Sequence, residues 1–413
     1  MKDILTVILL LVCLSTKPNA DAARLMGVMG TLAAFLLPCV LLTALHDPLL
    51  AVFGLKQYAL FPTIAVAMCL AYHPHNLSQI FTLFRLIGLS VIITTLVAVA
   101  QNRLPAANWL NLSVTGDDMS GFSAGGFLRV SSTFSFVGQY CFYLNALCYG
   151  LPTYFYFSTL FRQRGASLQV PVLVGLFGIG MYVTGSRGSV VGNATILGLA
   201  GILSAFLAGK RAVANLLVFA ALGAVIITGV RSLHPEFFAA YEARSAGSEE
   251  VSHRREIEER VKSGLLGWIS GTENAPPTLF GYGLGVMTNG SQKLSSYAAS
   301  WRASGFWTES DQLSTLFEGG WYLVLIWYGF RAWTVIYCFG LLLKIRSLKL
   351  RGVACLALGF IIVIGAVGTL GMQPPLAIWW WLAVGLVACL SHFDRVQSQE
   401  KTSPRRVQNA CGL

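Results

Sequence analysis

Long apolar stretches recur along almost the whole chain, separated by short polar turns. A helix crosses the hydrocarbon core of a bilayer in about 17 to 25 residues. Stretches of this length lie near residues 25–45, 49–72, 80–100, 134–158, 169–186, 189–208, 213–229, 311–341, 352–371 and 374–392. A shorter apolar run at 4–16 fits a signal peptide or a first transmembrane helix, and the many later spans favour the helix. The pattern predicts an all-α polytopic membrane protein with about 10–12 transmembrane helices.

One long polar interval interrupts this pattern. Residues 231–308 hold 16 of the 47 charged side chains, eight basic and eight acidic, so the interval has no net charge. We therefore divide the chain into N-terminal helices over 1–230, a large loop over 231–308, C-terminal helices over 309–392 and a basic tail over 393–413.

The composition excludes two other classes of protein. Of the 413 residues, 55% are hydrophobic and 11% are charged, which is under half the roughly 25% charge of a soluble domain. A disordered chain is excluded because 25 Phe, 14 Tyr and 10 Trp provide more apolar surface than disorder tolerates.

The formal net charge of +11 lies on the short turns and the tail. Four basic groups carry most of it: Lys344, Arg346, Lys349 and Arg351; Arg162 and Arg164; Lys210 and Arg211; and Arg395, Lys401, Arg405 and Arg406. The positive-inside rule assigns these groups to the cytoplasm, and the number of spans between them agrees. Residues 101–130, the loop 231–308 and Arg187 then face outside. Topology accounts for the charge, so no nucleic-acid partner is predicted.

The cysteines and histidines indicate no redox or metal chemistry. Eight of the nine cysteines fall in apolar spans and Cys411 lies in the tail, so neither outer segment has a disulfide framework. No CxxC or HExxH spacing occurs, and the six histidines are scattered. We predict no metal and no cofactor.

A single arginine stands between two apolar stretches. Arg187 follows Ser186 and is flanked by Gly185 and Gly188, and glycines allow a tight reversal and close backbone approach. A guanidinium beside the backbone N–H groups of a helix start is a good site for an anion, particularly a phosphate. An arginine that snorkels to the interface is the alternative, and spacing alone does not choose between them.

Arg129 is the second outer arginine, just before the span at 134–158. Taken alone, it favours a juxtamembrane anchor. In the large loop, Arg254 and Arg255 belong to a charge-rich run at 252–262 that favours a solvated helix with i,i+4 ion pairs over an anion site.

Two acids open the span that follows the loop, and a third lies deeper in it. Glu309 and Asp311 suit a helix N-terminus, which Thr308 or Ser310 can cap. Glu318 lies roughly 13 Å further along the same helix. A carboxylate at that depth needs a partner, and we expect an arginine.

Glycines alternate in the segment just before these acids. Gly281, Gly283 and Gly285 have no strand–GxGxxG–helix context, which excludes a dinucleotide fingerprint. They predict a turn that folds the loop back on the membrane.

These motifs together resemble the O-antigen polymerase and O-antigen ligase superfamily of bacterial envelopes. The resemblance covers about residues 125–330, and hydropathy alone extends it further. Four segments carry it: Arg129–Phe134; the Ser186–Gly188 turn; Arg254 and Arg255 with Leu279–Gly285; and Glu309–Leu313 with Glu318 and Gly320. Ligases of this family usually have a histidine at the position of Glu309, so the carboxylate there favours a polymerase.

The resemblance implies a metal-independent glycosyltransferase of the GT-C type. It would transfer an oligosaccharide from an undecaprenyl-diphosphate donor to a sugar-chain acceptor, on the outer face of the inner membrane, with the C-terminus in the cytoplasm. Membrane lipid and other polysaccharide-assembly proteins are candidate partners.

The same resemblance implies roles for individual residues. Arg129, Arg187, Arg254 and Arg255 would bind the diphosphate, and Glu309 or Asp311 would act as general base. Ser186, Gly188 and Glu318 would support the site, and Trp301 and Trp307 would stack on sugars. The alternative function is a transporter, such as a flippase of lipid-linked sugars. Charges distributed through the depth of several spans would favour it, and only Glu318 and Arg331 are of that kind.

Overall fold

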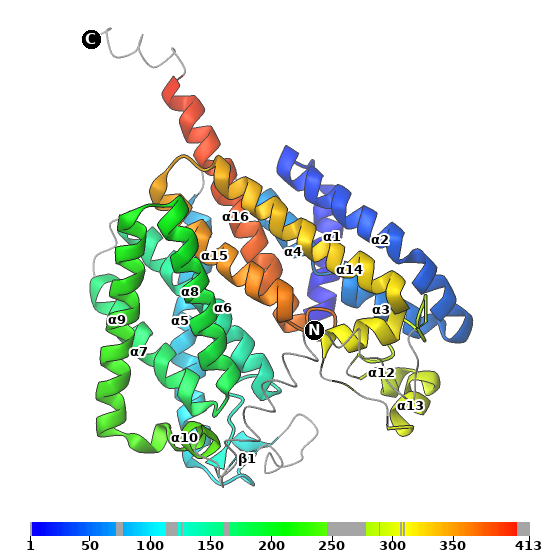
Figure 1. Cartoon of the computed structure of the whole chain (residues 1–413), viewed down its shortest axis with the longest axis horizontal. Helices are drawn as coiled ribbons and strands as arrows, with labels where there is room; N and C mark the ends of the chain where they lie inside the picture. Colours follow the sequence, from blue (N-terminus) through cyan, green and yellow to red (C-terminus); the bar gives the residue numbers. More distant parts are fainter. Residues whose placement is uncertain are drawn as a thin grey trace.

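The computed structural model describes residues 2–71, 77–112, 123–124, 127–160, 166–245, 278–288, 290–305, 308 and 310–402. The described part of the chain is almost entirely helical (Figure 1). The N-terminal elements are α1 Lys2–Ser15, α2 Ala20–His46, α3 Pro48–Ala59, α4 Thr63–Ala71, α5 Leu77–Arg103, the 3-10 turn η1 Trp109–Asn111, and the short strands β1 Ser123–Ala124 and β2 Phe127–Leu128. Next come α6 Val137–Leu160, α7 Ala166–Val183, α8 Arg187–Leu207, α9 Lys210–Leu233, η3 Pro235–Phe237 and α10 Ala239–Ser245. The last elements are α12 Ser291–Leu294, α13 Ser296–Ala303, α14 Asp311–Lys344, α15 Leu348–Val367 and α16 Pro374–Thr402.

The helices coincide with the predicted apolar stretches. Within the described residues, α2, α5, α8, α9, α14, α15 and α16 are long and apolar enough to cross a membrane, and α3 with α4, bent by 49°, form an eighth candidate. The remaining predicted stretches are the helices α1, α6 and α7. The chain is therefore an all-α polytopic membrane protein.

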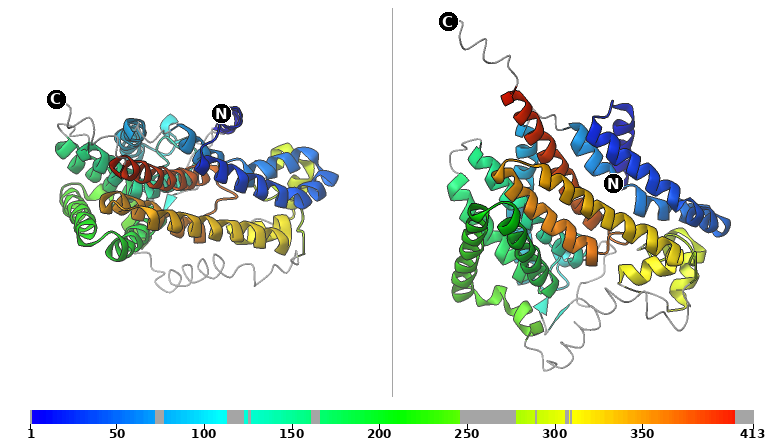
Figure 2. Two further views of the ribbon diagram at one scale, coloured as in Figure 1. Left: turned by 90° about the horizontal axis from the view of Figure 1, so that it is seen from above. Right: turned by 45° about the horizontal axis from the view of Figure 1, so that its top comes forward.

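Two groups of helices flank α15 and α16. Helices α5 to α10 lie on one side, and α1 to α4 with α12 to α14 lie on the other (Figures 1 and 2). Most of α15 and α16 is buried, because α15 packs on α8, α6 and α14 while α16 packs on α4, α6 and α14. Helix α9, by contrast, has no buried residue and forms the rim of its group.

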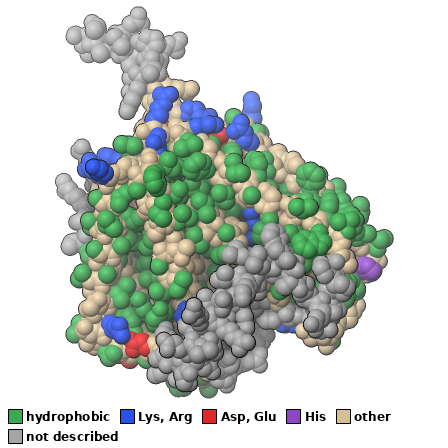
Figure 3. Space-filling model, viewed as in Figure 1, with side chains coloured by type: hydrophobic (Ala, Val, Ile, Leu, Met, Phe, Trp, Pro, Cys, Tyr) green, Lys and Arg blue, Asp and Glu red, His purple; other side chains and the backbone are tan. Residues whose placement is uncertain are grey.

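The predicted basic groups that fall within the described residues share one end of the bundle. The Arg351 guanidinium donates hydrogen bonds to the carbonyls of Leu207 and Ile345, which joins the α8–α9 turn to the α14–α15 turn. Asp394 of α16 accepts from the backbone N–H groups of Arg346, at 2.6 Å, and of Ser347, at 3.0 Å. Figure 3 shows Lys and Arg side chains gathered at this end, above a wide hydrophobic belt.

The two predicted outer segments meet at the opposite end. Arg103, at the end of α5, forms a 3.4 Å ion pair with Glu236 of η3, and α10 contacts both strands and α7. The pairing of β1 with β2 is antiparallel, with Ser123 opposite Leu128.

Helix α14 is broken near its start. Gly320 has φ 63° and ψ −162°, a backbone conformation that only glycine adopts without strain. Asp311 forms an ion pair with Arg331, although twenty residues of straight helix would separate them by about 30 Å. The chain must therefore fold back at Gly320. A first arm, 311–319, then lies against a second arm, 321–344 (Figure 1).

The loop at 278–283 replaces the helical hydrogen bonds lost at this break. In a continuous helix the N–H groups of Trp321 and Tyr322 would donate to the carbonyls of Phe317 and Glu318. Instead, four bonds run to the loop: Trp321 N–H to Thr278 O, Tyr322 N–H to Leu279 O, Tyr282 N–H to Phe317 O and Gly283 N–H to Glu318 O, at 2.8–3.2 Å. Every backbone group freed by these two lost bonds thus has a partner, as an apolar environment requires.

We predict that Gly320→Ala destabilises the protein by at least about 2 kcal/mol. A Cβ there would lie 2.2 Å from the Thr278 carbonyl oxygen, in a backbone conformation that strains any other residue. Gly329→Ala on the same helix is the matched control, because its Cβ would meet nothing within 4 Å. Thermal unfolding in detergent measures both, and equal midpoints for the two variants would contradict the role of the break.

Candidate functional site

Glu318 ends the first arm of α14 and is 1% exposed. Its carboxylate accepts hydrogen bonds from the Tyr58 hydroxyl at 2.8 Å, from the Met287 N–H at 2.9 Å and from the Thr288 hydroxyl at 3.4 Å. The expectation of an arginine partner was wrong. Because the helix folds back at Gly320, Asp311 and not Glu318 meets the buried arginine. Glu318 instead joins α3, α14 and the loop.

Asp311 begins the first arm, after Ser310, which caps it as predicted by accepting from the Leu313 N–H. One carboxylate oxygen accepts from Arg331 and from the Tyr328 hydroxyl at 3.2 Å, and the other accepts from the Gly371 N–H at 3.1 Å. Asp311 is 1% exposed. With both oxygens bonded, it attaches the first arm to the segment that leads into α16.

Arg331 is also buried, at 2% exposure. It donates to the carbonyls of Gly365 and Gly368 at 3.4 and 3.2 Å, beyond its bond to Asp311. Its guanidinium lies over the rings of Trp327 and Tyr328, with 4.9 and 4.7 Å to their centroids. A charge in a membrane helix needs partners of this kind.

The glycine-rich turn packs against helices on both sides. Gly281 and Gly285 have φ values of 69° and 87°. A Cβ on Gly281 would lie 2.5 Å from the Gly319 nitrogen, and one on Gly285 would lie 2.9 Å from Gly54 Cα of α3. Alternate glycines are therefore needed where the loop backbone touches helix backbones on both sides.

Further contacts dock this loop on the end of α2. The Leu284 N–H donates to the Thr43 hydroxyl at 2.7 Å, and the Tyr297 ring stacks on His46 with centroids 4.9 Å apart. The pKa of the Asp47 carboxyl is lowered by hydrogen bonds from the Ser295 side chain and from the first N–H groups of α3.

Trp301, predicted to stack on a sugar, packs inside the loop. Its ring lies 4.9 Å from Tyr282 and 5.0 Å from Phe317, centroid to centroid. Trp307 lies outside the described residues.

Arg187 is the first residue of α8 and is half-buried. The reversal before it uses Gly185, with φ 60°, and Thr184, whose hydroxyl accepts from the Ser186 N–H at 3.0 Å. The Ser186 side chain does not cap α8. Gly188 has ordinary helical geometry and is exposed, so the turn itself requires only Gly185.

Arg129 follows β2, and a buried glutamine, Gln101, holds the chain three residues after it. Ser132, with φ 56°, donates its N–H to the Gln101 side chain at 2.7 Å and its hydroxyl to the Thr94 carbonyl at 2.6 Å. These bonds attach the chain just after Arg129 to the end of α5. Ser132 of this motif therefore has a structural role.

The predicted site residues share one end of the bundle but lie in two groups of helices. Arg129 and Arg187 belong to the group around α10, which contacts both α7 and the hairpin. Asp311 and Glu318 belong to α14, across α15 and α16 (Figure 1). Glu309, Arg254 and Arg255 lie outside the described residues.

Sequence reasoning missed Tyr58, Gln101 and Thr43, because polar residues within an apolar run give no sign of a distant partner. Arg331 had a signal, since it is a charge inside a span. No group of three or more His, Cys, Asp or Glu suited to a metal occurs in the described parts of the chain.

Comparisons with protein-family models, with curated proteins and with solved structures give no match. The class of the protein therefore follows from its own fold, which is that of a multi-pass helical membrane protein.

We predict that Asp311→Asn and Arg331→Met each lower the free energy of unfolding by about 3–5 kcal/mol, because each leaves a buried charge without its partner. The double variant should lose clearly less than the sum of the two. Arg103→Met is the control, since both side chains of its 3.4 Å pair with Glu236 are about half exposed and such pairs contribute about 0–1 kcal/mol. Denaturant unfolding measures all four, and strict additivity of the single variants would be the contrary result.

A second pair of variants separates the two glycines beside Arg187. Gly185→Ala should destabilise by about 1–2 kcal/mol because of its left-handed backbone. Gly188→Ala should leave stability unchanged or slightly raised, since its Cβ would meet only the Ser186 hydroxyl, at 3.7 Å. Thermal midpoints decide, and a greater loss for Gly188→Ala would show that the turn is built differently.

Proposed function

We propose that this protein is a membrane glycosyltransferase of bacterial envelope polysaccharide assembly. It polymerises or ligates oligosaccharides carried on undecaprenyl diphosphate, at the outer face of the inner membrane, and its fold is of the GT-C type. The proposal rests on the sequence resemblance and on how the arginines, the loop and the basic turns are distributed over the bundle.

The observation that carries the proposal is the position of Arg187. It starts α8, while the other end of α8 leads to Lys210 and Arg211 at the basic end. The positive-inside rule assigns the basic end to the cytoplasm, and hence Arg187 and Arg129 to the outer side. A lipid diphosphate keeps its anionic head at that interface. A helix N-terminus that carries a guanidinium suits such a head group.

The transfer reaction assigns further roles. An acceptor hydroxyl attacks the anomeric carbon of the donor, the bond from that carbon to the diphosphate oxygen breaks, and the hydroxyl proton passes to a carboxylate. The diphosphate leaves as charge develops on it, and the arginines stabilise that charge. Asp311 is a poor base, since both its oxygens are bonded and buried. We therefore assign the base to Glu309, which precedes the helix cap Ser310.

The buried contacts of α14 support this assignment. Asp311 holds one end of the first arm and Glu318 holds the other end to the loop. The helix that follows Glu309 in the sequence is therefore attached at both ends of its first arm. In this scheme Glu318 is a positioning residue.

We predict that purified protein in detergent elongates or transfers an undecaprenyl-diphosphate oligosaccharide, as mass spectrometry detects, and that EDTA does not prevent this. Arg187→Ala should lower the rate by at least about 100-fold, the scale of losing one stabilising group in a transition state. Arg211→Ala, at the basic end, is the matched control and should keep the wild-type rate.

Other outcomes of this assay reassign the protein. Donor consumption only after addition of a separate lipid or protein acceptor would identify a ligase or a protein-directed transferase. An intact donor that crosses the membrane of proteoliposomes would reject glycosyl transfer and identify a transporter. An intact donor that also stays on its own side would reject both functions.

A further inference from the structure

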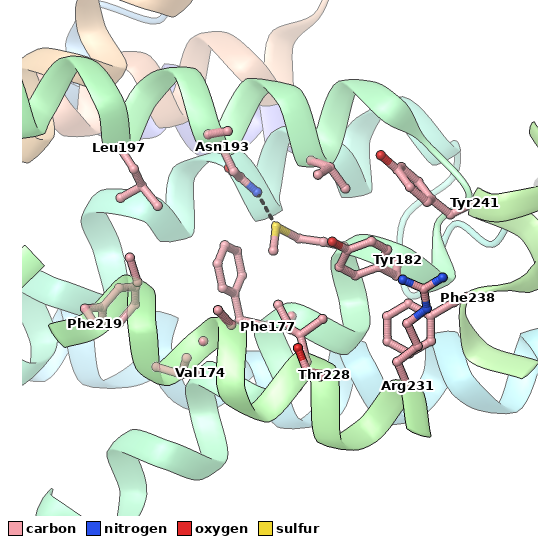
Figure 4. Close-up of a pocket in the computed structure, with 18 of the residues that line it drawn as sticks. Val174, Phe177, Tyr182, Asn193, Leu197, Phe219, Thr228, Arg231, Phe238 and Tyr241 are labelled. Carbon is pink, nitrogen blue, oxygen red and sulfur yellow. Dashed lines mark hydrogen bonds between the residues drawn. The ribbon is translucent and has the colours of Figure 1, made fainter. Parts of the chain in front are cut away.

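A cavity of about 630 Å³ lies between α7, α8 and α9 and ends at Phe238 and α10 (Figure 4). Its walls are mostly apolar, with Phe177, Leu197 and Phe219 among the larger side chains that point into it. The volume falls within the range of about 300–1,000 Å³ that is usual for binding sites of small molecules.

The cavity exists because small residues line the three helices. Gly178, Ala194 and Ala224 all face it. At Gly178 the backbone of α7 approaches α9 so closely that a Cβ would lie 2.7 Å from the Ile227 side chain. Helices α7 and α9 thus pack closely at Gly178 and Ile227, and the space between them and α8 remains unfilled.

Only one helix separates this space from the bilayer. Helix α9 has no buried residue, and Val225 on its outer face is 71% exposed. In a polytopic membrane protein, an exposed apolar face of this kind contacts lipid. An apolar chain can therefore enter beside α9 without crossing water.

The outer end of the cavity carries polar and charged groups. Arg231 forms a 2.7 Å ion pair with Glu242, and the two side chains are 64% and 45% exposed. The Tyr182 ring lies against Phe238 and Tyr241, with centroids 4.7 and 5.0 Å away, and Figure 4 shows Arg231 beside these rings. An exposed ion pair contributes little to stability. Arginine binds a phosphate more strongly, through bidentate hydrogen bonds.

The first turn of α8 lies at this same end. Val190 lines the cavity and follows Arg187 by three residues, which is less than one helical turn. The mouth therefore combines Arg231 with a helix N-terminus, two features that both attract phosphate.

We propose that this cavity holds the part of a polyprenyl chain nearest the head group, with the phosphate of that lipid at the mouth between Arg231 and the first turn of α8. This inference rests on the proposed function, because it assigns a binding place to the lipid of the donor. A polyprenyl phosphate has one chain, which suits one cavity between three helices. A glycerophospholipid would leave its second chain outside.

Two neighbouring residues of α9 provide the test. Ala224→Phe fills the cavity, whereas Val225→Phe places the same ring on the lipid-facing side. Undecaprenyl diphosphate bound to purified protein is measured by native mass spectrometry, with phosphatidylglycerol as the competing lipid. We expect Ala224→Phe to weaken binding at least about tenfold, equivalent to 1.4 kcal/mol, and Val225→Phe to bind like the wild type. Ala194→Phe fills the cavity from α8. It replaces Ala224→Phe in the binding measurement if Ala224→Phe does not fold.

The outcomes separate the cavity from the proposed function. Wild-type binding by both filled variants would overturn the assignment of the cavity, even if glycosyl transfer is observed. Equal occupancy by phosphatidylglycerol would overturn the choice of a polyprenyl chain. Binding that is lost only in the filled variants would support the lipid site, even if the protein proved to transfer no sugar.

Discussion

The fold of the C-terminal half depends on one backbone conformation, that of Gly320. With φ 63° and ψ −162° it turns α14 back on itself and leaves helix N–H and carbonyl groups unpaired. In a bilayer such groups must be bonded within the protein. The loop at 278–283 supplies those bonds through its own backbone. The break and the docked loop therefore require each other, and the glycines at 281 and 285 are the positions where backbones meet too closely for a side chain.

The buried charges of α14 follow from the same break. Asp311 and Arg331 meet because the two arms lie against each other. Glu318, at the bend, meets the hydroxyl of Tyr58 and the loop N–H of Met287. Each charged group thus has several partners, which is what makes a charge tolerable at depth. These contacts also join α3, the loop, both arms of α14 and the start of α16 into one unit.

The other group of helices has the opposite character. Between α7, α8 and α9 a cavity of about 630 Å³ remains, and glycines and alanines are among the residues that line it. Its polar groups, among them Arg187 and Arg231, are partly exposed at the end of the bundle opposite the basic turns. An apolar cavity with arginines at one end suits a donor with a lipid chain and an anionic head. In the proposed function, the unit around α14 holds the acceptor chemistry and this group of helices holds the donor.

The sequence by itself determined the membrane class, the positions of the helices and the grouping of the basic turns, because each depends on local apolar length or on charge near a helix end. It also predicted a turn at Gly281–Gly285, and the structure shows that this turn contacts α3 and α14. Only the tertiary structure decided the partners of the buried charges. Arg331 is nearer in sequence to Glu318 than to Asp311, and a straight helix would have kept it far from both. The bend at Gly320 brings Arg331 to Asp311. Glu318 instead accepts a hydrogen bond from Tyr58, which is 260 residues away in the sequence. Such pairings depend on which segments meet in space, and no local pattern carries that information.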